Sequence, residues 1–377
     1  MRIVSLSCRD YRNLAPLCFS PKPEGNVLWG QNAQGKTNLL EALWIFTGGR
    51  SFRGAKDSEL VRHGAAGARL LLSFYSEERE QSAEIRIAGG RRQVLLNGIA
   101  LHSPGELVGH VYAVIFSPEH LALVRGGPAN RRSFMDAALC QMKPGYAGIL
   151  SRYHRALSQR NALLKDIPRH WELEDTLPIW DARLVQDGER IVSQRKAFLS
   201  RLSVFASSVY AGLSHGAESL QIFYHASAPN FADNLQKEHK QDIRQGFTGA
   251  GPHRDDMVLQ LNDSSARSYA SQGQKRSIVL ALKLAEAHIL EECTGEKPAV
   301  LLDDVLSELD SARQDYLLNH LSQYQVFITC CEPQQAMNLH SGGLFRVENG
   351  MVTAAGPEKR KGEVYVSSSG TEHGDTK

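Results

Sequence analysis

The sequence predicts an α/β fold built on a parallel sheet, with a helical lobe inserted between two parts of that sheet. Three observations predict it. A glycine-rich loop at residues 30–37 lies between a short apolar run and a stretch with helical periodicity. A second apolar run, 299–302, ends in the two acids Asp303 and Asp304. Between these features, residues 130–213 are rich in Leu, Ala and Arg and lack the alternation of strands.

The first elements in the chain are two strands and a helix. Residues 2–7 alternate in character, and the apolar run 26–29 ends at Gly30, so both are predicted as strands. A helix is expected over residues 36–46, because its apolar residues recur at helical spacing. The pair Gly48 and Gly49 is expected to end it.

Antiparallel strands should follow between residues 68 and 116. The predicted strands are 69–74, 83–87 and 92–96, and Gly89–Gly90 separates the last two. Asn97 and Gly98 then form one of the strongest sequence signals for a tight hairpin turn.

The inserted region should contain several helices of moderate length, interrupted at Pro144, Pro168 and Pro178. Apolar heptads are not sustained, so a long coiled coil is not expected. A strand is then predicted at 220–224, and helices and strands alternate over 273–292, 299–302, 310–322 and 326–330.

These elements predict four segments. Residues 1–125 form the first part of an α/β head, 126–215 a helical lobe, and 216–356 the second part of the head. The polar residues 357–377 are predicted to be a disordered tail.

Composition excludes several classes of protein. The 377 residues are 42% hydrophobic, which is enough for two lobes with a core. No run approaches 18 apolar residues, and the first residues lack a secretory pattern, so we expect a cytoplasmic protein without a membrane partner. Six cysteines without a C-x-x-C pair argue against a disulfide framework or zinc site. The net charge of +2 argues against a uniformly basic nucleic-acid-binding protein.

The loop at residues 30–37 fits the pattern G-x-x-x-x-G-K-[ST] at every fixed position, which predicts a phosphate-binding loop. Its glycines let several backbone N–H groups point at one phosphate chain, and the helix that follows favours an anion at its N-terminus. Lys36 is expected to neutralise the β- and γ-phosphates of ATP, and Thr37 to bind Mg²⁺. The predicted nucleotide-binding residues here are Gly30, Gln31, Asn32, Ala33, Gln34, Gly35, Lys36 and Thr37.

Asp303 and Asp304 provide the second half of the predicted site. Acids at the end of a buried parallel strand lie at the sheet edge where ligands bind. We expect Asp303 to hold the metal with Thr37, and Asp304 to orient or deprotonate an attacking water. Lys36, Asp303 and Asp304 are thus the predicted catalytic residues. The alternative for either acid alone is a helix N-cap.

Residues 271–274 form a weaker signal. Ser271, Gly273 and Gln274 precede a long predicted helix, whose N-terminus could bind a further phosphate. The alternative is an ordinary serine N-cap. The order of the three motifs along the chain favours the binding site, because it is the order used by ATP-binding-cassette ATPases.

Seven segments together resemble the RecF family of bacterial DNA replication and repair proteins, within the ATPase heads of the cassette and SMC type. They are residues 30–42, 49–53, 116–119, 128–136, 248–256, 271–276 and 301–310. The resemblance implies a Walker A loop at 30–37, a Walker B pair at Asp303 and Asp304, and a signature motif at Ser271, Gly273 and Gln274. In this family the signature reaches ATP on the other subunit, so the resemblance implies an ATP-dependent homodimer with a D-loop at 307–310.

The same resemblance implies a function in recombinational repair and the SOS response. It implies binding to double-stranded DNA near single-strand gaps, action with RecO and RecR, and indirectly the loading of RecA. It also implies a weak, DNA-stimulated ATPase. Two departures concern hydrolysis: Asp304 stands where the cassette families usually have Glu, and the cassette Q-loop Gln is not found near residues 116–119.

The charge is unevenly distributed along the chain. Residues 125–205 contain 14 Lys and Arg against 8 Asp and Glu, a net charge of +6, whereas the rest of the chain totals −4. Clustered cations of this kind bind phosphates, although a solvated helix face explains most charge runs. The candidate DNA contacts are Arg131, Arg132, Arg152, Arg155 and Arg160.

Three other functions use similar motifs, and each makes a different demand on the chain. An SMC chromosome protein needs hundreds of heptad residues between Thr37 and Ser271, where this chain has about 230. A transporter ATPase subunit would lack the basic helical lobe and need a membrane partner. A DNA adaptor that uses ATP only as a ligand would bind DNA without releasing phosphate.

Overall fold

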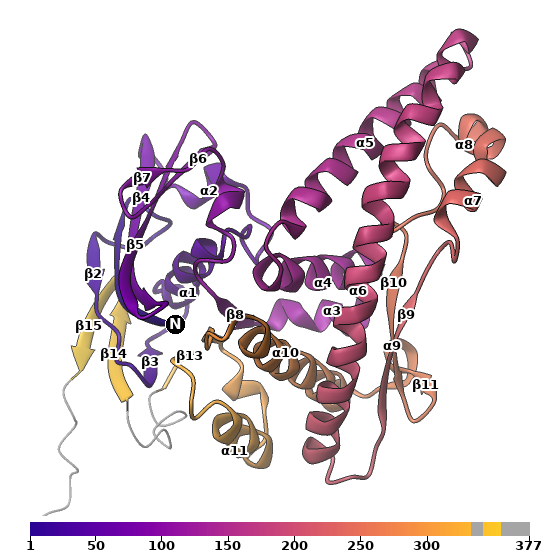
Figure 1. The fold of residues 1–377 in the computed structure, drawn as a ribbon. Helices are drawn as coiled ribbons and strands as arrows, with labels where there is room; N and C mark the ends of the chain where they lie inside the picture. The colour runs from indigo at the N-terminus through magenta and orange to yellow at the C-terminus, as the bar shows by residue number, and fades with distance from the viewer. Residues whose placement is uncertain (333–341, 356–377) are drawn as a thin grey trace, which may run out of the picture.

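The computed structural model describes residues 1–332 and 342–355, in two six-stranded sheets, a small third sheet and a group of helices (Figure 1). The predicted tail, 357–377, lies outside the described residues. No helix in the described ranges is both long and apolar enough to cross a membrane.

The central sheet has the order β15-β14-β3-β13-β12-β8, and all neighbouring pairs except β14–β15 are parallel. Its strands alternate between two cores: Leu301 packs on one side with Phe327, and Leu302 on the other with Ile328. Burial on both faces is why the four inner strands β3, β8, β12 and β13 are nearly all apolar, whereas β14 and β15 at one edge are largely exposed. The strands are β3 (Gly25–Trp29), β8 (Ala113–Phe116), β12 (Ala299–Asp303), β13 (Val326–Cys330), β14 (Gly342–Glu348) and β15 (Met351–Ala355).

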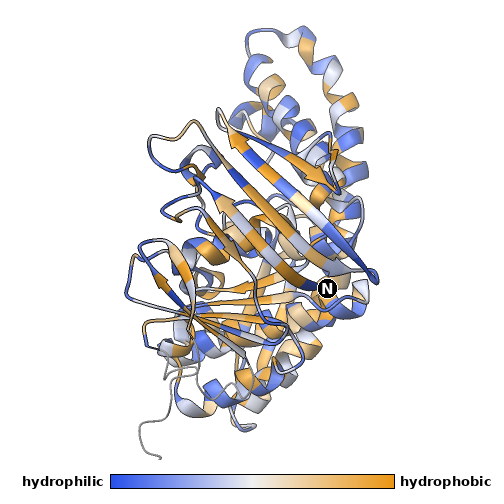
Figure 2. Ribbon diagram, turned by 90° about the vertical axis from the view of Figure 1, so that its left-hand side faces the viewer, coloured by the Kyte–Doolittle hydropathy of each residue, from blue (hydrophilic) through white to orange (hydrophobic). Residues whose placement is uncertain are grey.

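The second sheet is antiparallel and encloses helix α1 (Lys36–Trp44) against the central sheet. Alternate residues of β4 are buried, and Figure 2 shows the matching alternation of hydropathy along these strands. The strand order is β2-β1-β4-β5-β6-β7, with β1 (Arg2–Arg9), β2 (Leu17–Phe19), β4 (Gly67–Ser76), β5 (Arg79–Ala88), β6 (Arg91–Leu96) and β7 (Ile99–Ala100). Short helices flank it: η1 (Ile45–Thr47), α2 (Asp57–Leu60) and η2 (Pro104–Leu107).

The helical lobe contains α4 (Pro128–Met142), α5 (Tyr146–Asp166), η4 (Trp171–Thr176) and α6 (Leu177–Leu213), after η3 (Pro118–Leu121) and α3 (Ala122–Arg125). Helices α5 and α6 lie side by side and project away from the sheets (Figure 1). The expectation of helices of moderate length was wrong for α6, which has 37 residues. Pro178 does not interrupt it, because a proline in the first turn costs no hydrogen bond.

The third sheet, β11-β10-β9, packs beside α6. It consists of β9 (Leu220–His225), β10 (Asp256–Leu261) and β11 (Ser264–Ser265), accompanied by α7 (Phe231–Lys237), α8 (His239–Gln245) and α9 (Ala266–Tyr269). The chain then returns to the central sheet through α10 (Gln272–Thr294), η5 (Leu306–Glu308) and α11 (Ser311–His320).

Most predicted elements are confirmed within a few residues, including the three antiparallel strands after residue 68. The region 68–116 is not antiparallel throughout, however. Its last strand, β8, pairs in parallel with β12 in the central sheet. An all-apolar strand of four residues fits a sheet that is buried on both faces, and β8 is buried throughout.

Candidate functional site

The glycine-rich loop connects β3 to α1 at the carboxyl end of the parallel strands. Three of its residues have left-handed backbones: Gly30 with φ 153°, Ala33 with φ 65° and Gly35 with φ 113°. A Cβ on Gly30 would lie 2.2 Å from the carbonyl oxygen of Val347, so this position requires glycine. The loop geometry is therefore fixed by close backbone packing.

Lys36 lies under the loop and is 8% exposed. Its ammonium donates to the carbonyl oxygen of Gly30 and, at 2.9 Å, to that of Gln31. A cation so held lies beside backbone N–H groups at a helix N-terminus, which is a favourable place for a phosphate.

Residues outside the motif also support the loop, and they are not among the site residues predicted from the sequence. Asn13 donates to the carbonyl of Ala33 at 2.9 Å. The turn of the β14–β15 hairpin holds Gln34: the N–H of Asn349 donates to its side chain at 2.6 Å, and the N–H of Gly350 donates to its carbonyl at 3.0 Å. Asn349 and Gly350 form the Asn-Gly pair typical of hairpin turns, a signal that was available in the sequence.

Asp303 and Thr37 meet although they are 266 residues apart in the chain. The Thr37 hydroxyl donates to Oδ1 of Asp303 at 2.8 Å, and the hydroxyl of Thr329 donates to the same oxygen at 2.9 Å. Thr329 is brought there by register, because it pairs with Asp303 between β13 and β12. Burial raises the pKa of Asp303, and the two hydroxyl hydrogen bonds oppose that rise.

Asp304 follows with a left-handed backbone, φ 52°. Its N–H donates to the Thr329 hydroxyl at 2.9 Å, so one threonine contacts both acids. The Ser307 hydroxyl donates to Asp304 at its backbone oxygen, at 2.9 Å, and at Oδ1, at 3.1 Å. Asp304 is therefore joined to the start of the segment 307–310.

Glu119 is a third acid near this edge that was not among the predicted site residues. It follows β8, the strand beside β12, and its charge helps to raise the pKa of Asp303. It is exposed. Parallel strands end at the same edge of a sheet, so the pairing of β8 with β12 brings residues 117–119 near Asp303.

This arrangement fits ATP with Mg²⁺. Mg²⁺ prefers oxygen ligands, and it is usually held by one or two carboxylates together with substrate phosphates and water. The Thr37 hydroxyl and the Asp303 carboxylate provide adjacent oxygens beside the loop. Bound there, the metal would neutralise charge on the phosphates, while Lys36 and the loop N–H groups hold them.

The predicted signature residues lie at the start of α10. The Ser271 hydroxyl accepts from the N–H of Gln274 at 3.2 Å, and the N–H of Ser271 donates to the Gln274 side chain at 2.6 Å. This capping box is the alternative that the sequence left open for Ser271, and it is present. Ser271 is nevertheless exposed, and no Cβ on Gly273 would meet another atom, so this helix N-terminus is open to a ligand or partner.

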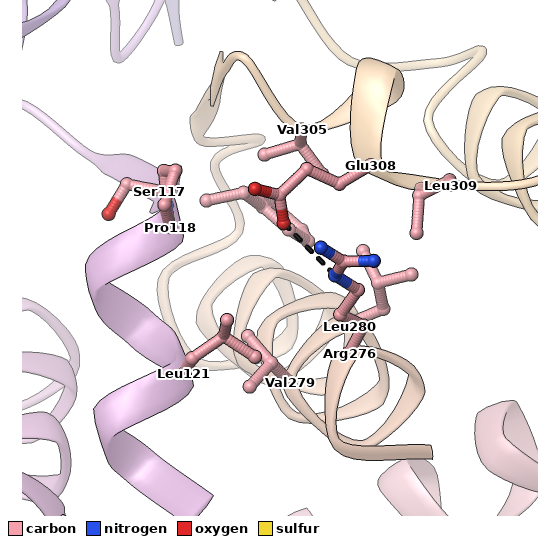
Figure 3. A pocket seen from close by; sticks show the side chains of 10 residues that line it. Ser117, Pro118, Leu121, Arg276, Val279, Leu280, Val305, Glu308 and Leu309 are labelled. Carbon is pink, nitrogen blue, oxygen red and sulfur yellow. Dashed lines mark ion pairs between the residues drawn. The ribbon is translucent and has the colours of Figure 1, made fainter. Parts of the chain in front are cut away.

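Two ion-pair and hydrogen-bond links join α10 to the segment 307–310. Arg276 pairs with Glu308 at 3.1 Å, at the pocket between η3, α10 and η5 that Figure 3 shows. Arg313 donates to the Ser277 hydroxyl at 2.9 Å and also pairs with Asp310. Helix α10 and this segment are thus directly connected.

The five arginines proposed to contact DNA have different environments. Arg155 is exposed, Arg152 is half-exposed and pairs with Asp187 at 2.9 Å, and Arg132 is partly buried and donates to the Asp255 carbonyl at 2.8 Å.

The prediction was wrong for Arg131 and Arg160. Arg131 is 6% exposed and binds both carboxylate oxygens of Asp256, at 2.7 and 2.8 Å. Arg160 is fully buried and pairs with Asp181 at 2.6 Å and with Asp242 at 2.7 Å. Both guanidinium groups tie the lobe to residues of β10 and α8 and are not available to phosphates.

Comparison with known sequences gives consistent results. Residues 2–353 match the family described as the RecF/RecN/SMC N terminal domain. The DNA replication and repair protein RecF of Acetivibrio thermocellus is 38% identical over 365 residues, which cover 93% of this chain and 99% of that protein. The RecF of Agathobacter rectalis is 39% identical over 333 residues, which cover 88% of this chain and 92% of that protein.

Solved structures show a similar fold. The recombination mediator protein RecF with ATP, of the RecFOR pathway, has a TM-score of 0.89 and 36% identity, over 94% of this chain and 98% of that one. An Smc head domain of Pyrococcus furiosus with an extended coiled coil has a TM-score of 0.57 and 16% identity, over 94% of this chain and 96% of that one. The second likeness concerns the fold alone.

Proposed function

This chain belongs to the RecF branch of the RecF/RecN/SMC family, and from that premise we propose that it is an ATP-dependent DNA-binding protein of recombinational repair. The observation that supports the proposal best is the contact between Thr37 and Asp303, 2.8 Å apart beside Lys36. A hydroxyl, a carboxylate and an ammonium are the groups that bind a nucleoside triphosphate and its metal in phosphate-binding loops, which supports the proposal.

ATP hydrolysis is expected for an ATPase of this family, and we propose that it is slow and stimulated by DNA. Lys36 would hold the β- and γ-phosphates, Asp303 and Thr37 would hold Mg²⁺, and Asp304 would orient the attacking water. The short side chain of Asp304 is already hydrogen-bonded to Ser307, which supports slow turnover.

We propose that ATP brings two subunits together, with Ser271, Gly273 and Gln274 of one contacting the ATP of the other. A ligand favours a dimer only through contacts that the monomer lacks, and the exposed N-terminus of α10 could supply one. Ser271→Arg should leave ATP binding intact and abolish the ATP-dependent dimer in light scattering. A dimer of wild-type strength would exclude the shared site.

The proposed ligand of the dimer is duplex DNA near single-strand gaps. We propose that it binds along the helical lobe, residues 126–215, which is inserted in the chain between the two parts of the head, 1–125 and 216–356. RecO and RecR are the proposed partners, with RecA loading and the SOS response as the outcome in the cytoplasm. Exposed cations on α5 and α6, among them Arg155 and Arg190, support DNA binding there.

Fluorescence anisotropy tests the proposal directly. The full chain is titrated onto duplex, single-stranded and gapped DNA, with ATP, with ADP and without nucleotide. We expect tighter binding to duplex or gapped DNA with ATP, and Lys36→Met should remove the effect of ATP. Equal affinity in all three nucleotide conditions would contradict the proposal. Phosphate release measured alongside separates an ATPase from an adaptor that only binds ATP.

A further inference from the structure

We propose that the far end of the α5–α6 pair is a docking surface for a protein that presents basic residues around an apolar pocket. This inference rests on the proposed function, in which RecO and RecR act with this chain. We define the tip as residues 166–181, from the last residue of α5 through η4 to the first turn of α6 (Figure 1).

The tip is acidic on an otherwise basic lobe. It contains five Asp and Glu and one Arg, a net charge of −4, whereas residues 125–165 and 182–205 contain 13 Lys and Arg and 3 acids, a net charge of +10. Four of the acids are exposed: Asp166, Glu172, Glu174 and Asp175. The net charge of +6 over residues 125–205 therefore conceals two surfaces of opposite sign.

The same tip exposes large apolar side chains. Trp171 is 78% exposed and Ile179 is 59% exposed. Tryptophan buries a large area when a partner covers it, and tryptophans are enriched among the residues that dominate binding energy at interfaces.

The tip is ordered by a small core and by contacts with α8. Leu164, Ile167 and Leu177 form a small buried core, against which Ile243 of α8 packs. His239 of α8 also contacts Glu174 at 2.9 Å. Because these contacts anchor the segment on both sides of Trp171, the tryptophan is presented by an ordered surface and loses little freedom on binding.

Charge decides which partner fits. DNA phosphates would be repelled by the acids of the tip, and so would the tip of a second copy. A protein surface with Lys or Arg around an apolar pocket complements both the acids and Trp171. The basic remainder of the lobe stays free for DNA, so both ligands could bind the lobe at once.

Surface plasmon resonance with the full chain immobilised, and with purified RecR or RecO of the same organism as analyte, tests this. The tip variant carries Trp171→Ala with Ile179→Ser. The matched control is Ile99→Ser on β7, a residue that is 71% exposed and outside the tip. We expect the wild type and control to bind one analyte and the tip variant to lose at least about tenfold in affinity. The unfolding midpoint and the ATP-dependent affinity for DNA should not change.

Three results would overturn the inference: an unchanged affinity of the tip variant, no binding of either analyte by the wild type, or a loss of DNA affinity alone. A change in oligomeric state of the tip variant would instead identify a second copy as the occupant and also overturn it. Failure of the proposed function is seen separately, as the absence of an ATP effect on DNA binding by the wild type.

Discussion

Arg276 of α10 pairs with Glu308 of the segment after Asp303 and Asp304, at 3.1 Å. Both side chains are about one-third exposed, so the pair adds little to folding, about 0–1 kcal/mol. Its position is more informative, because it joins the helix that would contact a second subunit to the segment that follows Asp304.

Glu308→Gln should therefore affect coupling more than stability. We expect ATP binding to be unchanged, and the proposed ATP-dependent dimer and the rate of phosphate release to fall about three- to tenfold, because α10 loses one of its two links to residues 307–310. The charge-swapped double variant, Arg276→Glu with Glu308→Arg, should recover part of the loss. An unchanged dimer in Glu308→Gln would show that the pair is only structural.

Asp303→Asn tests the assignment of the metal ligand. The amide keeps the size of the side chain but removes its charge, so nucleotide binding through Lys36 and the loop should persist. Phosphate release should fall by at least about a hundredfold, because an amide would hold Mg²⁺ weakly and the negative charge of the phosphates would no longer be balanced by the metal. Thr329→Val is the variant to compare with Asp303→Asn. It removes the hydroxyl that contacts both acids but leaves both carboxylates, so it separates the loss of a hydrogen bond from the loss of a charge. Undiminished turnover in Asp303→Asn would remove this residue from the site.

The difference between exposed and buried arginines gives a third prediction. Arg155→Gln with Arg190→Gln should weaken DNA binding and reduce the slope of log affinity against log salt by about one for each phosphate contact removed. Arg160→Gln should instead destabilise the protein by about 3–5 kcal/mol, because Asp242 is left buried without its partner. Unfolding midpoints measured beside the salt titrations separate the two effects. An unchanged salt slope in the first variant would place the DNA surface elsewhere.

The meeting of the glycine-rich loop with the acids of β12 could be predicted from sequence because each motif is local. The loop pattern specifies backbone shape, and two acids after an apolar strand specify a sheet edge, so the sequence places Thr37 and Asp303 at the same edge, where the structure has them in contact. Thr329 was not predicted, because its role depends on the pairing of β13 with β12. The sequence of one strand does not specify which distant strand it pairs with.

The arginines show the same limit. Arg160 and Arg155 look alike in the sequence, five residues apart on one helix, yet one is fully buried and the other exposed. The partner that decides this is Asp242, which is 82 residues further along the chain. Helix α5 packs against α6 and α8, and the face that meets them is set by tertiary contacts rather than by the charge run.

The last prediction concerns His253, in the loop between α8 and β10, which contacts α5 of the helical lobe. Its ring lies between the Tyr153 hydroxyl, 2.7 Å from Nδ1, and the Thr248 carbonyl, 3.1 Å from Nε2. One donor and one acceptor suit a neutral imidazole. Burial lowers the pKa of His253 to about 4, from an ordinary value of 6.5, and the charges of Arg254 and Arg132 act in the same direction.

The folded state therefore binds fewer protons at His253 than the unfolded state does between pH 6.5 and 4. The contribution of His253 to the free energy of unfolding is complete above pH 6.5. It is lost as the pH falls, and the loss is about 2 kcal/mol between pH 7.5 and 5. His253→Gln, which cannot titrate, should lack this loss, so the free energies of unfolding of wild type and variant in urea should converge by that amount. His63→Gln, at an exposed position, serves as a control for the loss of a histidine elsewhere in the chain. A difference between wild type and His253→Gln that stays constant with pH would mean that His253 is not held neutral by the fold.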